Sequence, residues 1–200
     1  MKKKKIIITG GAGFIGSHIA ERYTQKNAEI IILDNLSTGR LDNIRKFKDK
    51  VTFIKCDLSK NGKWNQYFKE AHCVYHLASL ADIVPSIEKP IDYYSSNVTS
   101  TINVLEACRK YKSKKIVYAA SSSCYGIPKN YPTNERDKIS PMYPYALTKY
   151  LAEEILFHWN KIYKIPSVSL RLFNVYGVRS RTNSTYGAVM GVFFCSKISR

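Results

Sequence analysis

The stretch Lys5-Ile6-Ile7-Ile8-Thr9-Gly10-Gly11-Ala12-Gly13-Phe14-Ile15-Gly16 decides the fold of this chain. Its apolar run predicts a short buried strand, and a helical apolar pattern begins at residue 14. The glycines at 10, 13 and 16 allow a tight turn, close approach of the backbone to a pyrophosphate, and close packing of helix on strand. The helix would direct its N-terminal amides at the phosphates. The stretch therefore predicts a dinucleotide-binding turn.

An acidic residue at the end of the next expected strand supports this prediction. Asp34 follows the expected strand 29–33, whose last four residues are apolar. A carboxylate there can accept hydrogen bonds from the adenosine ribose hydroxyls and would repel a 2′-phosphate, so it favours NAD over NADP. Arg40 could weaken that preference but lies beyond the strand end. The alternative is an ordinary glycine-rich turn followed by a surface aspartate, which the strand–turn–helix context disfavours.

Extended apolar runs alternate with helical patterns along the chain. This order predicts an α/β fold, a doubly wound parallel sheet with helices on both faces. The expected strands are 5–9, 29–33, 51–55, 73–77, 115–119 and 167–172. The expected helices are 14–25, 41–47, 64–69, 91–111, 145–163 and, near the end of the chain, 188–198.

Further candidate residues follow the third and fourth expected strands. Asp57-Leu58 comes after strand 51–55, where an aspartate can meet an adenine edge. Leu77-Ala78-Ser79 comes after His76, where small residues let the backbone approach a cofactor. Ligands of open α/β sheets bind at the carboxyl ends of the strands, so these residues are expected to line the site. His76 itself is expected to be a packed, hydrogen-bonded residue rather than a catalyst.

Tyr145 and Lys149 form a candidate catalytic pair. They stand four residues apart at the start of an expected helix, just after Pro144, which suits a first helical position. Positions i and i+4 share one face of a helix. An ammonium held near a phenol lowers the pKa of the tyrosine, which would make Tyr145 a general base. The alternative is a core-edge tyrosine beside a solvated lysine.

Composition narrows the class of protein. The 200 residues are 44% apolar and include 15 Tyr and 8 Phe, which suits a folded domain and argues against disorder. No apolar run is long enough to span a bilayer, and the run after the N-terminal lysines is too short for a secretory signal. The five cysteines are an odd number without a Cys-x-x-Cys pair. We therefore expect reduced thiols in a cytoplasmic protein, with no disulfide framework and no metal site.

The net charge of +17 comes from 32 Lys and Arg against 15 Asp and Glu. Attraction to polyanions is one interpretation of such an excess. The lysines are scattered, however, and no recognised nucleic-acid-binding module accompanies them. We expect a lysine-rich surface, with neither a nucleic acid nor a membrane as partner.

Four features together resemble the extended short-chain dehydrogenase/reductase superfamily: the turn from Thr9 to Gly16, Asp34-Asn35, Asp57-Leu58 and Tyr145-x-x-x-Lys149. Within it the chain resembles the nucleotide-sugar 4-epimerases over essentially its whole length. The resemblance implies a Rossmann fold, NAD as cofactor and a nucleotide sugar, expected to be a UDP-sugar, as substrate. Val178 replaces a proline common in relatives, a mild departure.

The resemblance also implies roles for single residues. Tyr145 matches the catalytic base, Lys149 its partner, and Ser121 the hydroxyl that binds the reacting sugar oxygen. The full set expected at the cofactor is Gly10, Gly13, Phe14, Ile15, Gly16, Asp34, Asn35, Asp57, Leu58, Leu77, Ala78, Ser79, Asn97, Tyr145, Lys149 and Phe173. The set expected at the substrate is Ser86, Ser121, Ser122, Ser123, Tyr145 and Asn174.

Ser122 and Ser123 discriminate among the reactions of such relatives. Sugar dehydratases and decarboxylases carry acids there, since removing a C5 proton and expelling a hydroxyl needs an extra acid/base. Two neutral hydroxyls fit an epimerase, in which Tyr145 takes the proton of the 4-hydroxyl while C4 passes hydride to tightly bound NAD. Hydride then returns to the other face of the 4-ketose. The alternatives are an NAD-dependent dehydratase or reductase, or a non-catalytic NAD-binding domain.

The resemblance has consequences for domains and assembly. Family members continue well past residue 200, so we expect 1–178 to be the NAD-binding domain with the catalytic residues. Residues 179–200 would begin a substrate-binding region whose lobe is largely absent. A homodimer is expected through a four-helix interface of helices 91–111 and 145–163. Exposed apolar residues on both helices would support it.

Overall fold

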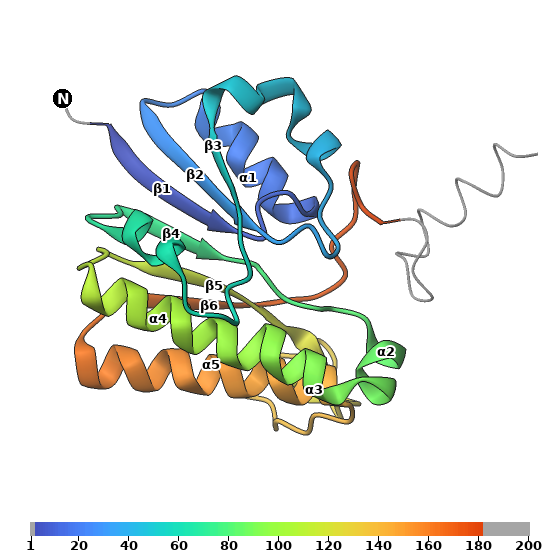
Figure 1. The fold of residues 1–200 in the computed structure, drawn as a ribbon. Coiled ribbons are helices and arrows are strands. Elements are labelled where there is room, and N and C mark those ends of the chain that lie inside the picture. The colour runs from blue at the N-terminus through green and yellow to red at the C-terminus, as the bar shows by residue number, and fades with distance from the viewer. Residues whose placement is uncertain (1–2, 182–200) are drawn as a thin grey trace, which may run out of the picture.

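The structure, a computed structural model, describes residues 3–181. In this part of the chain all six expected strands form one sheet (Figure 1). The strands are β1 (Lys4–Thr9), β2 (Ala28–Asp34), β3 (Thr52–Lys55), β4 (Cys73–His76), β5 (Ile116–Ser121) and β6 (Ser167–Leu172). Their order is β3-β2-β1-β4-β5-β6, and every neighbouring pair is parallel. The expected doubly wound parallel sheet is confirmed.

Helices pack on both faces of this sheet. α1 (Phe14–Thr24) and the 3₁₀ turns Arg45–Lys50 cover one face over β1 and β2. α4 (Ser100–Lys110) and α5 (Pro144–Tyr163) lie side by side on the other face (Figure 1). Successive residues of a strand point to opposite faces, so Ile7 enters the α4–α5 core while Ile6 and Ile8 enter the α1 core. Burial on both sides explains the continuous apolar runs in β1 and β2.

The outer strand β6 is covered on one side only within the described residues. Ser169 and Arg171 face α5, whereas Val168 and Leu170 point the other way and are 52% and 46% exposed. The helix expected at 188–198 lies outside the described residues, as does most of the expected region 179–200. In residues 3–181, no helix has both the length and the apolar character needed to cross a membrane.

Two segments expected as short α-helices are 3₁₀ turns. They are Leu41–Asn43 with Arg45–Lys50, and Lys63–Phe68. Segments this short gain few backbone hydrogen bonds for the cost of nucleation, so packing of their apolar side chains decides their geometry. Phe47 and Phe68 are buried and hold the turns against the sheet.

The helix expected over 91–111 is a continuous helical run with three parts: α3 (Pro90–Tyr93), a π-helical segment Tyr94–Thr99, and α4. The Thr101 hydroxyl donates to the carbonyl of Asn97 at 2.6 Å. Such bonds to residue i−4 compete with the backbone ladder, and π segments often occur at functional sites. The sequence did not predict α2 (Ile83–Glu88), a short helix just before this run.

Candidate active site

The glycine turn lies where the carboxyl ends of β1, β2 and β4 meet. The Gly10 amide donates to the Leu33 carbonyl at 2.8 Å, and Gly10 has a positive φ of 66°. A Cβ at this position would stand 2.8 Å from the amide nitrogen of Ala78. Only glycine therefore lets the loop after β1 approach the loop after β4 so closely.

Asp34, the last residue of β2, ties its strand to the glycine turn. Its Oδ2 accepts from the Ala12 amide at 2.9 Å and its Oδ1 from the Leu36 amide at 2.8 Å. Burial raises the pKa of this carboxyl, and the Leu36 and Ala12 amides oppose the rise. The position next to the turn agrees with the sequence prediction, and the two amide bonds give Asp34 a structural task that the sequence did not reveal.

Six of the residues expected at the cofactor line one hollow beside this turn. The hollow lies at the topological switch between β1 and β4, where open α/β sheets bind their ligands. The six are Asp34, Asn35, Asp57, Leu58, Ala78 and Ser79. Ser96 and Ser100 also line it, and sequence reasoning missed both. A serine in a helix gives no signal by itself; Ser96 lies in the π-helical segment and Ser100 at the start of α4.

Ser121 and Tyr145 meet at the neighbouring strand end. Ser121 is the last residue of β5, and its Oγ lies 2.8 Å from Ser123 Oγ. Tyr145 is the second residue of α5, after Pro144 and Tyr143. The hydroxyls of Ser121 and Ser123 face its phenol. The arrangement brings three of the expected catalytic and substrate residues together.

The pKa of Tyr145 differs from the sequence expectation. Burial raises it, the hydroxyls of Ser121 and Ser123 lower it, and the charge of Asp82 raises it further. Lys149 does not lower it as expected, because its Nζ lies over the ring of Tyr118, 4.4 Å from the centroid. Lys149 itself is 3% exposed, and burial lowers its pKa to about 7 although Glu153 raises it. The ammonium is therefore only partly populated near neutral pH.

Asn97 connects the loop after β4 with the catalytic helix. Its side chain accepts from the Leu80 amide at 2.8 Å and donates to the Leu80 carbonyl and to Thr148 Oγ1. The residue is 1% exposed. In this structure it positions the residue before Lys149, and its expected contact with a cofactor stays a prediction.

His76 is a packed residue, as expected. It is fully buried, with Nδ1 2.7 Å from Thr9 Oγ1 and Nε2 3.0 Å from Thr101 Oγ1. Burial and the nearby Lys149 lower its pKa to about 3. The ring is therefore neutral at physiological pH and joins β1, β4 and α4.

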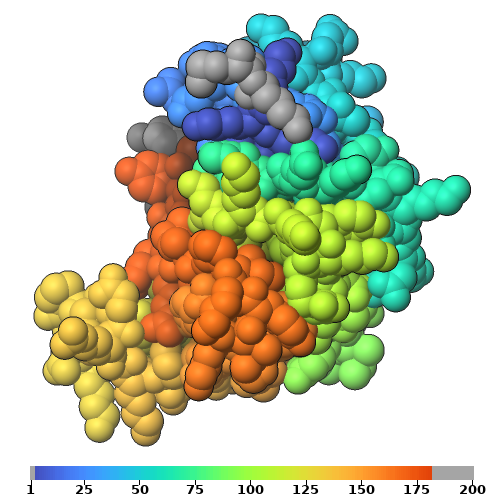
Figure 2. All heavy atoms as spheres, turned by 90° about the vertical axis from the view of Figure 1, so that its left-hand side faces the viewer, coloured from blue at the N-terminus to red at the C-terminus, as the bar shows by residue number. Residues whose placement is uncertain are grey.

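A second hollow of about 640 Å³ lies next to the candidate catalytic residues. Ser122, Ser123 and Phe173 line it, together with Tyr125 and residues of the following loop. This loop, within residues 126–143, projects from the body of the molecule (yellow in Figure 2). The hollow brings the β5 end and the β6 end into one apolar site.

Two expected substrate residues are not brought into this second hollow. Ser86 is fully buried in α2, where its hydroxyl donates to the Ile83 carbonyl at 2.5 Å. Asn174 is exposed just after β6. Sequence reasoning also missed Tyr93, whose ring stands edge-on to Tyr145 at 6.5 Å, and Asp82, which pairs with Arg181 at 3.0 Å.

Comparisons with known proteins show the family of this chain. A model of the NAD dependent epimerase/dehydratase family matches residues 6–196. A putative UDP-glucose 4-epimerase of Methanocaldococcus jannaschii is 40% identical over 186 residues, which are 92% of this chain and 60% of that protein.

Solved structures are similar as well. A UDP-N-acetylglucosamine 4-epimerase from Methanobrevibacter ruminantium, in complex with UDP-N-acetylmuramic acid, has a TM-score of 0.94 and 34% identity, over 100% of this chain and 64% of that chain. A UDP-glucose 4-epimerase from Thermus thermophilus, in complex with NAD, has a TM-score of 0.80 and 34% identity, over 96% of this chain and 60% of that chain. The chain thus spans between 60% and 64% of the length of these relatives.

Proposed function

The chain belongs to the NAD-dependent epimerase/dehydratase family, and we propose that it forms the cofactor-binding and catalytic part of a nucleotide-sugar 4-epimerase. The observation that carries the proposal is the meeting of Tyr145, Ser121 and Ser123 at the sheet edge that also holds the glycine turn. We assign residues 1–178 to an NAD-binding domain and 179–200 to the start of a substrate-binding region.

NAD is the cofactor that this proposal requires, and the residues at the sheet edge suit it. The glycine turn leaves no room for a side chain at Gly10 and leads directly into the N-terminus of α1, an end of a helix that favours phosphate groups. Each carboxylate oxygen of Asp34 can accept two hydrogen bonds and uses one for an amide, so acceptors remain for ribose hydroxyls. When bound, NAD supplies the hydride acceptor and donor.

Tyr145 takes the proton of the sugar 4-hydroxyl in the proposed reaction and later returns it. Because burial raises its pKa, the phenol works as a base near neutral pH only with donors and positive charge nearby. Ser121 and Ser123 supply hydroxyls. The charged form of Lys149, one helical turn away, would supply the cation in the proposed reaction. Ser121 also orients the reacting oxygen.

Epimerisation is preferred over dehydration because of the groups around Tyr145. Ser122 and Ser123 are neutral, and the carboxylate that acts on Tyr145, Asp82, is paired with Arg181. We propose a UDP-sugar as substrate, supported by the UDP-sugar epimerases among the similar proteins. Its sugar would lie in the second hollow, whose volume is in the range of small-molecule sites.

We further propose a homodimer and a cytoplasmic location. Ile91 and Tyr94 on the run before α4, and Leu147 and Phe157 on α5, are all at least 42% exposed. Apolar groups on both helices suit a four-helix interface. Cys56, Cys73, Cys108 and Cys124 are free thiols, which suits a reducing compartment.

Product analysis with UDP-glucose and NAD tests the reaction type. An epimerase gives a mixture of two 4-epimers with no net NADH, whereas a reductase consumes NADH and a dehydratase gives a 4-keto-6-deoxy sugar. Tyr145→Phe should lower turnover by at least about 100-fold, the usual size of a general-base effect, while NAD still binds. Near-normal turnover of this variant would contradict the role of Tyr145. Binding of NAD without any conversion by the parent chain would favour a binding domain.

A further inference from the structure

Glu153 is a buried carboxylate that the proposed reaction does not yet use. It lies on α5 one helical turn beyond Lys149, and its side chain is 2% exposed. A buried charge is costly unless it is paired and hydrogen-bonded. Its presence beside a catalytic lysine therefore needs an explanation.

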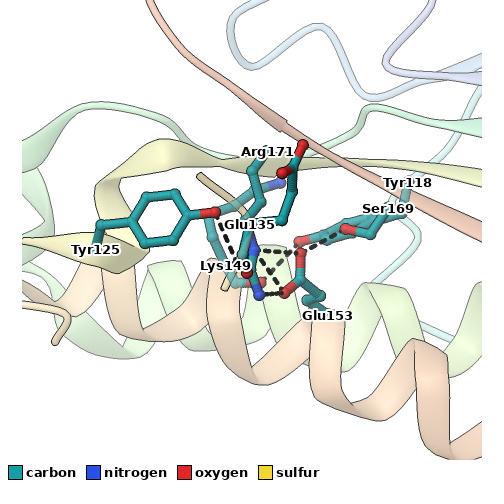
Figure 3. Close-up of polar contacts among 7 residues, drawn as sticks. All are labelled: Tyr118, Tyr125, Glu135, Lys149, Glu153, Ser169 and Arg171. Carbon is teal, nitrogen blue, oxygen red and sulfur yellow. Dashed lines mark hydrogen bonds and ion pairs between the residues drawn. The ribbon is translucent and has the colours of Figure 1, made fainter. Parts of the chain in front are cut away.

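Strand β6 supplies the partners of this carboxylate (Figure 3). Arg171 donates from Nη2 to Oε1 at 2.6 Å and from Nε to Oε1 at 3.0 Å. Ser169 donates to Oε2 at 2.6 Å. Arg171 also donates from Nη1 to the Tyr125 hydroxyl and to the Glu135 carbonyl. Both oxygens of Glu153 are thus fixed by neighbouring residues of one strand.

Lys149 and Glu153 are four residues apart on one helix, so their side chains share a face. The groups that surround the Lys149 ammonium from other elements carry no negative charge. From β4 the neutral His76 faces it, and from β5 the ring of Tyr118, whose pKa burial holds well above its usual range. On its own helix the neighbours are Tyr145, also protonated through burial, and Glu153. Among residues 3–181, Glu153 is the anion that acts on Lys149.

We propose that Glu153 is a positioning residue that favours the charged form of Lys149, one helical turn from Tyr145, and that Arg171 and Ser169 hold its carboxylate in place from β6. This inference deepens the proposed function and rests on it. Without Glu153, burial would favour the neutral amine, and the proposed reaction would lose the positive charge that Lys149 places one helical turn from Tyr145. Burial lowers the pKa of Lys149 to about 7, and the opposing charge of Glu153 acts against that fall.

A side-chain NMR titration of the lysines in the 200-residue chain tests this directly. Glu153→Gln should move the Lys149 midpoint down by about one pH unit or more, the effect of removing a nearby opposite charge. Glu154→Gln is the matched control, since it makes the same change at an exposed position of the same helix. It should leave the Lys149 midpoint within about 0.3 pH unit of the parent, well under that effect.

A second variant covers the case in which Glu153→Gln does not fold because Arg171 is left unpaired. Glu153→Gln with Arg171→Met removes both charges and should show the same downward shift. An unchanged midpoint in either folded variant would overturn the proposal and leave the pair as a purely structural link. The titration needs no substrate, so it stands apart from any failure of the chain to epimerise UDP-glucose. In an active chain, Glu153→Gln should lower kcat about tenfold or more at pH 7 with little change in KM. Equal losses in Glu154→Gln would also count against the proposal.

Discussion

His76 shows how burial sets the charge of a single side chain in this molecule. Its ring sits between two threonine hydroxyls with no access to water, so the proton that would charge it is excluded until about pH 3. In the unfolded chain the same ring takes up its proton near pH 6.5. Between these values the unfolded state binds more protons than the folded state, so stability rises with pH and is lost on acidification.

His76→Gln should therefore flatten the pH dependence of stability. The free energy of unfolding of the parent should fall by about 1.4 kcal/mol per pH unit between pH 6 and 4 through this residue alone. The variant should lack that contribution, whatever its stability at pH 7. Urea unfolding at several pH values measures the slope, and His158→Gln, at an exposed position on α5, serves as the control. Identical slopes in the parent and His76→Gln would contradict a buried neutral ring.

At the same scale, the sequence predicts where reactive groups lie better than it predicts their charge. Asp34 and Ser121 lie at strand ends and Tyr145 lies at the start of a helix, as the sequence predicted, because strand ends and helix starts are local properties. The raised pKa of Tyr145 and the pairing of Glu153 with Arg171 were not predicted. Both depend on burial and on contacts between elements distant in sequence.

At the scale of elements, the first turn of α1 depends on two glycines with different tasks. A Cβ on Gly16 would collide with the Gly10 carbonyl and stand 2.7 Å from Gly11 Cα. A Cβ on Gly13 would meet only the Gly10 carbonyl, at 3.1 Å. Gly16 is therefore needed for packing of the helix on the turn, whereas Gly13 is needed for access to the turn.

Gly16→Ala and Gly13→Ala should separate these tasks. We expect Gly16→Ala to lower the free energy of unfolding by about 1–3 kcal/mol, the usual cost of overpacking. Gly13→Ala should cost less stability but weaken NAD binding, because its methyl group stands where the pyrophosphate would approach. Thermal unfolding and fluorescence titration with NAD measure the two effects. Equal stability losses would contradict this division.

The expected helix 91–111 shows which feature of an element the apolar spacing does not predict. Apolar spacing predicted helix over 91–111, and the chain is helical there, but no periodicity announces the π-helical segment Tyr94–Thr99. In that segment Ser96 lines the hollow beside the glycine turn, and the Asn97 side chain bonds to Leu80 and Thr148. The sequence around it is rich in hydroxyls, and the Thr101 hydroxyl donates to the backbone of this segment at the Asn97 carbonyl.

At the scale of the whole molecule, the order of the strands gathers the site. Residues from the ends of β1 to β5 lie far apart in sequence, and the switch between β1 and β4 brings them to one edge. The alternation of strands and helices predicted this architecture, because a parallel sheet needs crossover helices. The same pattern could not predict which apolar side chains of the outer helices stay exposed, since that depends on which other elements cover each helix.

The outer surfaces of α4 and α5 carry the last prediction. The ends of the two helices lie side by side in Figure 2, and α5 exposes Leu147 and Phe157 by 42% and 44%. If this face forms the proposed dimer, Phe157→Glu places a charge in an apolar interface and should shift the chain to monomer, with a dissociation constant at least about 100-fold higher. Leu41→Glu is the control, since Leu41 is 46% exposed but lies on the 3₁₀ turn after β2.

Sedimentation equilibrium over a range of concentrations measures both variants against the parent. The parent and Leu41→Glu should be dimers with the same dissociation constant, and Phe157→Glu should be a folded monomer by circular dichroism. A monomeric parent would contradict the dimer itself, and a dimeric Phe157→Glu would place the interface elsewhere. A monomeric Phe157→Glu that still binds NAD would also show that the hollow beside the glycine turn is complete within one chain, as expected from lining residues at one sheet edge and on the adjacent helical run.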